Sequence, residues 1–586
     1  MTSIEPPVDD VALDAAPAPS HVELVKIASR RLRGGLQEAV VSDVPRFDDD
    51  DTVLLKFHGI YQQDNRDKRV KRGAPEEKAW QMMIRLTIPG GVLLADQYLA
   101  LDALADSLGN GTLRITTRQS IQFHGVLKGD LKPLLVEINK ALLTTIAACG
   151  DVSRNVMASP APIDDEVHRA VQATARELAD VLQPRTRAYY EIWLDGERVT
   201  DSRDDEPVYG DAYLPRKFKA GVAIDSDNSV DIYSYDCGLV AITSEGRVLG
   251  YNLLVGGGLG MTHNKASTFA RLATTLAFVE PANAVAAVRA VVELYRDEGN
   301  RSDRRHSRLK YLVERWGAER FLEELRQRVP FTLHAPSVVP APQQHDFLGV
   351  HPQGDGRFFA GVFVQSGRVA DRDGERTRTA LREIVATLRP GVRLTPMQSV
   401  LFTDLTESDV PTLRRILAAH GVRGDGELSN VVRYSMACPA MPTCGLALAE
   451  SERALPGVLE LLERELEQLN VSSVPLTVRM TGCPNGCARP YNADIGLVGR
   501  RPGVYHVFVG GGLRGDRLAD LFAGDVKVDQ IIPTLRPLLE RFASERYVDE
   551  GLGDYYQRVA GNPTPRHLLT GSEKPTAALF VHALSS

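Results

Sequence analysis

Four cysteines in two close pairs are the residues whose types and spacing most clearly predict chemistry. Cys438 and Cys444 form a C-x5-C pair, and Cys483 and Cys487 form a C-x3-C pair. Four thiolates are enough to hold one [4Fe–4S] cluster, and the Gly and Pro residues around both pairs let the backbone wrap a cluster closely. We therefore predict one [4Fe–4S] cluster. A structural zinc site is the alternative, although zinc pairs are usually more closely spaced.

The remaining cysteines predict no disulfide framework. Six cysteines in 586 residues are too few for one, and clustered cysteines in such a chain indicate metal binding or catalysis. Cys149 and Cys237 stand alone, and we interpret them as packing thiols.

Composition and charge exclude several classes of protein. The net charge of −7 and the pI near 6.1 give no basic excess for nucleic-acid binding. The sequence has no apolar run long enough to cross a membrane, and its N-terminus lacks the pattern of a secretory signal. We expect a cytoplasmic protein with no nucleic-acid or membrane partner, preceded by a flexible N-terminal extension over residues 1–50.

An internal duplication organises the chain. LRITTRQSIQF (113–123) recurs as VRLTPMQSVLF (392–402), and at the same offset RNVMASPA (154–161) recurs as RYSMACPA (433–440). The two copies predict homologous α+β modules and a pseudo-two-fold molecule with a central cleft. They differ in chemistry, because Cys438 replaces Ser159, whereas Arg118 and His124 have no counterpart in the second copy.

The sequence around the cysteines resembles one known family. TGCPNGCARPYNADIGL (481–497) fits the cluster signature of the siroheme-dependent sulfite and nitrite reductases, most closely the haemoprotein (beta) subunit of assimilatory sulfite reductase. The resemblance runs from about residue 57 to residue 555 and includes FHGIYQQDNRD, RQSIQFHG, RAYYEIWLDGE, YLPRKFK and SMACPAMPTCGLALAESER.

The resemblance implies an α+β fold of two ferredoxin-like half-repeats and two larger cofactor-binding domains around a central site. It implies siroheme as a second cofactor, whose iron shares the sulfur of Cys487 with the [4Fe–4S] cluster. We expect four units after the extension: residues 51–150 (first half-repeat), 151–337 (first siroheme and substrate domain), 345–425 (second half-repeat) and 426–586 (cluster and siroheme domain).

The resemblance also assigns cations to the two anionic ligands. Siroheme carries carboxylates and sulfite is an anion, so burying both requires positive charge. The family pattern places four residues around the substrate: Arg85, Arg154, Lys217 and Lys219. Residues spaced along RITTRQSIQFH, together with one lysine farther on, are expected to anchor siroheme carboxylates: Arg114, Arg118, Gln122, His124 and Lys310.

The expected reaction is the six-electron reduction of sulfite to sulfide. Reduction of nitrite to ammonia at the same site is the alternative, and Lys219 favours sulfite because the family's ferredoxin-dependent nitrite reductases generally carry Asn there. Electrons are expected from a separate protein, either an NADPH-dependent flavoprotein subunit or a ferredoxin. A haem-free iron–sulfur electron carrier or a zinc-stabilised binding protein is the hypothesis from a different class.

Two further patterns predict that this chain has neither a dinucleotide-binding loop nor a Tyr–Cys crosslink. GGGLRG (510–515) matches a dinucleotide-binding loop, but VGGGL occurs in both copies and is better interpreted as a turn against the central cofactor. Some ferredoxin-dependent family members carry a Tyr–Cys crosslink, using a cysteine shortly after the RNV motif. Met157, Ala158 and Ser159 stand there, so we expect no such crosslink.

Overall fold

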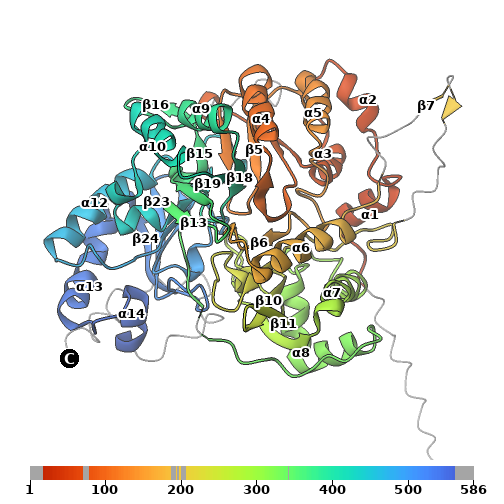
Figure 1. Ribbon diagram of the computed structural model, residues 1–586. Coiled ribbons are helices and arrows are strands. Elements are labelled where there is room, and N and C mark those ends of the chain that lie inside the picture. The colour runs from red at the N-terminus through yellow and green to blue at the C-terminus, as the bar shows by residue number, and fades with distance from the viewer. Residues whose placement is uncertain are drawn as a thin grey trace, which may run out of the picture.

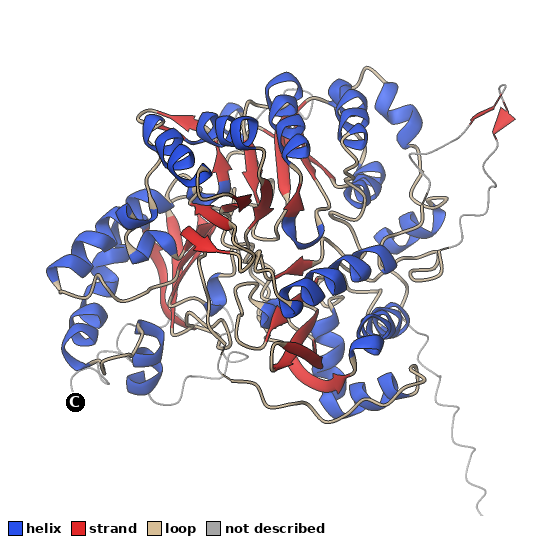
Figure 2. Ribbon diagram, viewed as in Figure 1, coloured by secondary structure: helices blue, strands red, loops and turns tan. Residues whose placement is uncertain are grey.

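The computed structural model describes residues 17–69, 78–186, 206–340 and 342–560, with the backbone of two short strands, β7 (Trp193–Leu194) and β8 (Glu197–Arg198). Most of the RAYYEIWLDGE motif and residues 1–16 lie outside the described residues. The sheets lie in the interior, and most helices lie on the outside (Figure 2). No helix in the described part is long and apolar enough to cross a membrane.

Two five-stranded antiparallel sheets correspond to the half-repeats and lie in the upper part of the molecule (Figure 1). The first has the order β1 (Ile60–Asp64), β2 (Trp80–Arg85), β5 (Ile121–Val126), β4 (Leu113–Ile115), β15 (Arg368–Val369), with helices α4 (Ala95–Leu108) and α5 (Leu131–Lys140). The second has the order β13 (Gly349–Pro352), β14 (Phe358–Val362), β19 (Val400–Leu405), β18 (Gly391–Leu394), β3 (Val92–Leu93), with helices α9 (Thr377–Leu388) and α10 (Asp409–Ala419).

The half-repeats exchange short strands. β15, from the second repeat, pairs with β4 of the first, and Arg368 stands opposite Arg114. In return β3, from the first repeat, pairs with β18 of the second. Each half-repeat therefore completes the sheet of the other, which fixes their relative position.

Two larger mixed sheets complete the pseudo-symmetry. In each, the first three strands pair in parallel and the last three pair antiparallel. The first contains β6 (Met157–Ala158), β9 (Ala220–Ile224), β10 (Cys237–Ser244), β11 (Arg247–Val255) and β12 (Thr274–Val279), with α6 (Glu166–Val181), α7 (Ala284–Glu298) and α8 (Leu309–Arg326). The second contains β20 (Ser435–Ala437), β21 (Val478–Thr481), β22 (Ile495–Arg501), β23 (Val504–Val509) and β24 (Asp520–Lys527), with α12 (Leu455–Gln468), α13 (Ile531–Glu545) and α14 (Leu552–Ala560).

Local sequence explains these elements. Every residue of β9 (AGVAI) and of β21 (VRMT) is buried, because strands covered on both faces have no solvent-facing side. Helix α6 begins where the Asp165 carboxylate accepts a hydrogen bond from the His168 backbone N–H. Helix α8 contains Gly317 at φ 76°, a conformation that suits glycine, which has no Cβ.

The N-terminal extension is ordered from residue 17, which corrects the prediction of a flexible segment over residues 1–50. It forms α1 (His21–Ala28), α2 (Leu36–Val41) and the start of α3 (Asp49–Leu55). Leu32 and Phe47 are buried in the main core, and the His58 ring hydrogen bonds to the Leu32 carbonyl at 3.0 Å. The short apolar segments between the polar residues therefore bury enough surface to order the chain.

Candidate functional site

The four clustered cysteines lie at the ends of two adjacent parallel strands, β20 and β21. Cys438 and Cys483 are buried, Cys444 is half-buried and Cys487 is exposed. Burial raises the pKa of Cys438, Cys444 and Cys483, and the neighbouring thiols raise it further. Positive metal charge is what would hold such thiols as thiolates, so this grouping suits a metal cluster.

Backbone amides approach the sulfurs closely. The Gly482 N–H donates to the Cys438 Sγ at 3.3 Å. A Cβ at Gly482 would lie 2.5 Å from the Ala449 carbonyl oxygen, so only glycine fits. Among the described residues, no three His, Cys, Asp or Glu side chains are arranged around a single metal ion. A cube differs from such a site because each of its four thiolates binds a separate iron.

The turn that carries Arg118 lies directly against Cys487. The Thr117 hydroxyl donates to the Cys487 carbonyl at 3.0 Å, and the Arg489 guanidinium donates to the Thr117 carbonyl at 2.9 Å. Arg118 itself donates to the Ala220 carbonyl at 3.3 Å and lies 4.8 Å from the Tyr235 ring centre. The first copy thus brings its cations to the exposed cysteine of the second copy.

Lys217 and Lys219 lie in this same crowded set of cations. Burial, followed by the charge of Arg154, lowers the pKa of Lys217 to about 7. Burial and the adjacent Lys217 lower the pKa of Lys219 strongly. An amine with a pKa near neutrality can bind an anion and release a proton. An anion bound here would restore the positive charge of these lysines.

Arg85 and Arg154 are held by neighbouring polar groups. Arg85 donates to the Cys149 sulfur at 3.1 Å, and with the Gln122 amide oxygen turned toward it, Arg85 Nε donates to that oxygen at 3.0 Å. Arg154 donates to the Tyr61 hydroxyl at 3.5 Å and to the Gly150 carbonyl at 3.3 Å. Both arginines are therefore oriented without a carboxylate partner in these contacts.

Cys149 is buried, as expected, but its contact is with the pocket. It accepts from Arg85, and its charge would raise the pKa of Tyr61. The expectation of no Tyr–Cys crosslink considered only residues after the RNV motif. Cys149 precedes that motif, so the sequence argument was incomplete. Cys237, in β10, is fully buried, and burial raises the pKa of its thiol.

The predicted carboxylate anchors fall into two groups. Neither ring nitrogen of the buried His124 has a hydrogen-bond partner among the described residues, nor do Nε and Nη1 of Arg118. Unpaired buried donors are costly, so these atoms fit an additional anionic ligand such as a carboxylated tetrapyrrole. Lys310 differs, because its ammonium donates to the carbonyls of Gly258, Gly260 and Phe269.

Arg114 belongs to an ion pair that joins the two halves. It contacts Glu452 at 2.6 Å and donates to the carbonyls of Ser366 and Ala437. Arg368 contacts the other oxygen of Glu452 at 2.7 Å. Glu452 follows the first cysteine pair, and its N–H donates to the Cys438 carbonyl. Arg114 therefore supports the cluster loop as well as the predicted cofactor face.

Removing Glu452 is expected to destabilise the fold. Burial raises the pKa of its carboxyl, but Arg114 and Arg368 outweigh burial and lower it to about 2. Glu452→Ala leaves the buried Arg114 and the half-buried Arg368 without this partner and should lower the free energy of unfolding, measured by chemical denaturation, by about 3–5 kcal/mol. In the wild type, the ionised Glu452 carboxylate stabilises the folded protein above about pH 4.5, and this contribution to stability is lost as the pH falls toward 2.

The control for this prediction is Glu460→Ala, which removes an exposed pair with Arg464. That change should lower the free energy of unfolding by less than about 1 kcal/mol. Equal costs for the two variants would contradict the structural role of the buried pair.

Sequence reasoning missed two carboxylates that organise the site. Asp236 binds Arg308 at 2.6 Å and accepts from the Lys219 N–H at 3.0 Å. Asp151 binds Arg304 at 2.8 Å, and its pKa is lowered to about 2 by the surrounding cations despite burial. Neither aspartate stands out in the sequence, because a single Asp beside a basic motif has many structural explanations.

The glycine-rich loops are turns, as predicted. The loop at 510–515 is followed by strand β24 and not by the helix that a dinucleotide site requires. The equivalent loop of the first copy approaches the second cysteine pair, because the Met261 N–H donates to the Pro484 carbonyl at 2.9 Å.

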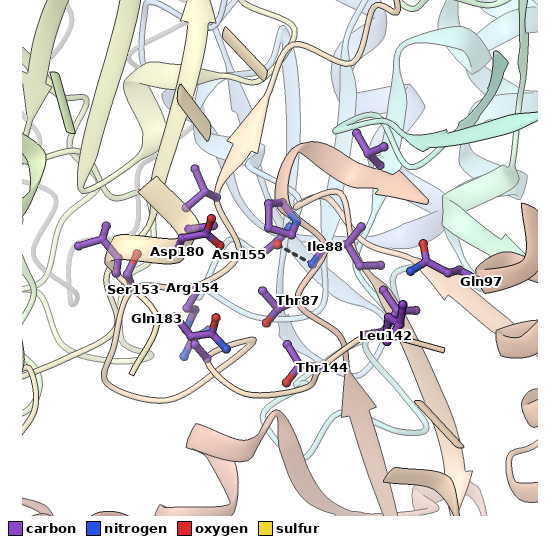
Figure 3. A pocket seen from close by; sticks show the side chains of 17 residues that line it. Thr87, Ile88, Gln97, Leu142, Thr144, Ser153, Arg154, Asn155, Asp180 and Gln183 are labelled. Carbon is purple, nitrogen blue, oxygen red and sulfur yellow. Dashed lines mark hydrogen bonds between the residues drawn. The ribbon is translucent and has the colours of Figure 1, made fainter. Parts of the chain in front are cut away.

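A cavity of about 300 Å³ is lined in part by the segment from Ser153 to Asn155, including Arg154 (Figure 3). Its lining includes Thr87, Asn155 and Gln183, and the Ile88 N–H donates to the Asn155 side chain at 2.7 Å. The cavity is lined by none of the four cysteines or the two pocket lysines.

A duplicated fold with four thiols beside a dense set of cations defines a redox protein that holds a cluster against an anionic cofactor. Family comparisons agree. Residues 174–333 match the nitrite and sulphite reductase 4Fe-4S domain, and residues 75–141 and 351–420 match the nitrite/sulfite reductase ferredoxin-like half domain.

Individual relatives cover nearly the whole chain. The ferredoxin sulfite reductase of Synechococcus elongatus is 44% identical, covering 92% of this chain and 89% of the relative. The NADPH sulfite reductase hemoprotein beta-component of Myxococcus xanthus is 44% identical, covering 93% and 97%. The Mycobacterium tuberculosis NirA structure matches with a TM-score of 0.75 at 25% identity, covering 92% and 97%.

The chain belongs to the nitrite and sulfite reductase family. It is an oxidoreductase whose cofactors are siroheme and a [4Fe–4S] cluster. The pseudo-two-fold α+β fold predicted from the duplication and the ferredoxin-like half-repeats implied by the resemblance are confirmed. The domain boundaries and the roles of individual residues stay predictions.

Proposed function

We propose that this protein reduces sulfite to sulfide with six electrons. The observation that carries the proposal is the group of cations at Lys217, Lys219 and Arg154 near Cys487, in which burial and the neighbouring positive charges lower the pKa of both lysines. Two lysines and an arginine suit a dianion better than a monoanion such as nitrite. The curated relatives named above are sulfite reductases, which supports the same substrate.

In this proposal the chain's own groups bind the anion and supply protons. Arg85 and Arg154 fix the substrate oxygens, since guanidinium groups suit bidentate contacts. Lys217 and Lys219 deliver protons as those oxygens leave as water. When bound, siroheme and the cluster supply the electrons and the metal at which sulfur–oxygen bonds break. Cys438, Cys444, Cys483 and Cys487 would hold the cluster, and Arg118, Gln122 and His124 would face siroheme carboxylates.

The electron donor is a separate protein in this proposal. Among the relatives, one name specifies ferredoxin and another specifies NADPH, so both a ferredoxin and an NADPH-dependent flavoprotein subunit are candidates. We propose a cytoplasmic setting, in which either donor is available.

The substitution Lys219→Asn tests the choice of substrate. It removes one cation from the pocket and should lower kcat/KM for sulfite about 10- to 100-fold while affecting nitrite less. Steady-state turnover of both anions with a chemical electron donor provides the measurement. Lys132→Asn, at an exposed lysine on α5, is the control and should leave both rates unchanged. Unchanged turnover of both anions in Lys219→Asn would contradict the role of Lys219.

A further inference from the structure

A buried charge network connects the N-terminal helix α1 to both substrate-binding segments. Glu23 and Lys26 of α1 are 1% and 0% exposed, and their charged groups lie 2.6 Å apart. Fully buried charges are uncommon on a short terminal helix, because burying an ion is costly unless it is paired. The partners of these two residues therefore indicate what the helix does.

Lys26 contacts the segment that leads to the pocket lysines. Its ammonium donates to the Leu214 carbonyl at 2.7 Å, three positions before Lys217 in the sequence. It also lies 3.7 Å from Asp151, three positions before Arg154. One side chain of the extension thus touches both chain segments that supply the substrate cations.

Glu23 reaches the same two segments through arginines. It pairs with Arg301, whose guanidinium donates to the Tyr213 carbonyl at 2.7 Å. It also lies 3.7 Å from Arg304, which binds Asp151 at 2.8 Å and donates to the Pro215 carbonyl at 3.3 Å.

The segment held in this way needs external support. Tyr213 has φ 52°, in the left-handed region that costs energy for a residue with a Cβ. Tyr213 is fully buried, and its ring lies 5.2 Å from that of Phe57. Charged side chains therefore fix the backbone from Tyr213 to Pro215: Arg301 and Arg304 lie in the same domain, and Lys26 reaches it from the N-terminal helix.

We infer that Glu23 and Lys26 are positioning residues, which hold the 150–154 and 213–219 segments so that Arg154, Lys217 and Lys219 converge on one anion. This inference deepens the proposed function and rests on it. The N-terminal extension then acts as part of the substrate site, although it touches neither substrate nor cofactor. A small displacement of such a segment can reduce the rate substantially, because the cations must meet the anion together.

The test compares two kinds of change in the same helix. Lys26→Met keeps the side-chain length but removes the contacts with Leu214 and Asp151. If the unpaired charge of Glu23 prevents this single variant from folding, the double variant Glu23→Gln/Lys26→Met removes both charges. Val25→Ala removes a buried apolar contact of α1 without touching the network, and it controls for loss of stability alone.

Two readouts are needed on full-length protein carrying its cofactors. The first is steady-state kinetics with sulfite and nitrite, in which the charge variants should raise KM at least tenfold relative to Val25→Ala at comparable melting temperature. The second is hydrogen–deuterium exchange, in which amides of residues 213–219 should exchange at least tenfold faster in the charge variants, with the sheet of β20–β24 unchanged.

The outcomes separate the two proposals. If exchange accelerates locally and KM rises for whichever anion the wild type reduces, the positioning role stands. If the wild type fails to reduce sulfite, the proposed function fails, while the exchange result still tests the network. Charge variants that match Val25→Ala in KM and in exchange would overturn the inference.

Discussion

Cys487→Ser is expected to abolish turnover of the anionic substrate and to disrupt the electronic coupling between cluster and siroheme. Cys487 is the exposed member of the four cluster cysteines, and its backbone contacts the turn that carries Arg118. It therefore lies beside the set of cations, and we propose it as the ligand that links the cluster to siroheme. Serine is a poor ligand for soft iron–sulfur centres, so we expect activity to fall by about a thousandfold or more.

Activity, visible spectrum and iron content provide the measurements for this variant. Cys237→Ala is the matched control, because Cys237 is fully buried in β10 and is not one of the four clustered cysteines, so its loss should affect folding slightly and the spectrum not at all. A Cys487→Ser protein with wild-type spectrum and turnover would show that another residue links the two cofactors.

Lys217→Met is expected to lower kcat for sulfite by about a hundredfold or more. Burial and Arg154 lower the pKa of Lys217 to about 7, so it can donate a proton near neutral pH. Its protonated form predominates below that pKa and is the form that attracts an anion. Activity should therefore fall as the pH rises through the pKa of Lys217, at pH 7 or above, since bound anions shift this pKa upward.

Lys217→Arg separates charge from proton transfer. Arginine stays protonated, so KM should remain near the wild-type value while kcat falls and the alkaline decline attributed to Lys217 disappears. Stopped-flow or steady-state rates across pH 6–10 provide the comparison. If Lys217→Met retains wild-type kcat, or if Lys217→Arg shows an unchanged pH profile, Lys217 is not the proton donor.

Local sequence was sufficient to predict the features that depend on repeats and motifs. The duplication predicted paired half-repeats, and the structure shows two sheets of matching order that exchange strands β3 and β15. The cysteine spacing predicted a cluster, and the four thiols do meet at the ends of β20 and β21. Both features can be predicted because repeated segments and clustered residue types are visible in the sequence itself.

Long-range charge pairing could not be predicted in the same way. Arg114 was expected to contact a cofactor, yet it pairs with Glu452, which is 338 positions away. Lys310 was expected to anchor a carboxylate, but it donates to three backbone carbonyls of the glycine-rich segment. A basic residue in the sequence shows a need for negative charge or carbonyl oxygen, and only the fold shows which acceptor provides it.

The N-terminal extension was misread for a related reason. The Pro-, Ala- and Asp-rich first twenty residues predicted flexibility, which was extended to residue 50, yet Glu23 and Lys26 are buried because their partners come from 151 and 301–304. Composition measures how much apolar surface a segment can bury. It does not register charges that are satisfied by distant parts of the chain.

The most direct test of the account is the visible spectrum of the purified protein, produced with siroheme synthesis, together with iron, zinc and acid-labile sulfide content. Siroheme absorption with about five irons per chain, four in the cluster and one in the haem, is the expected result. Protein that contains zinc, no acid-labile sulfide and no tetrapyrrole would contradict the account and support a zinc-stabilised binding protein. Cluster without tetrapyrrole would instead indicate an iron–sulfur electron carrier.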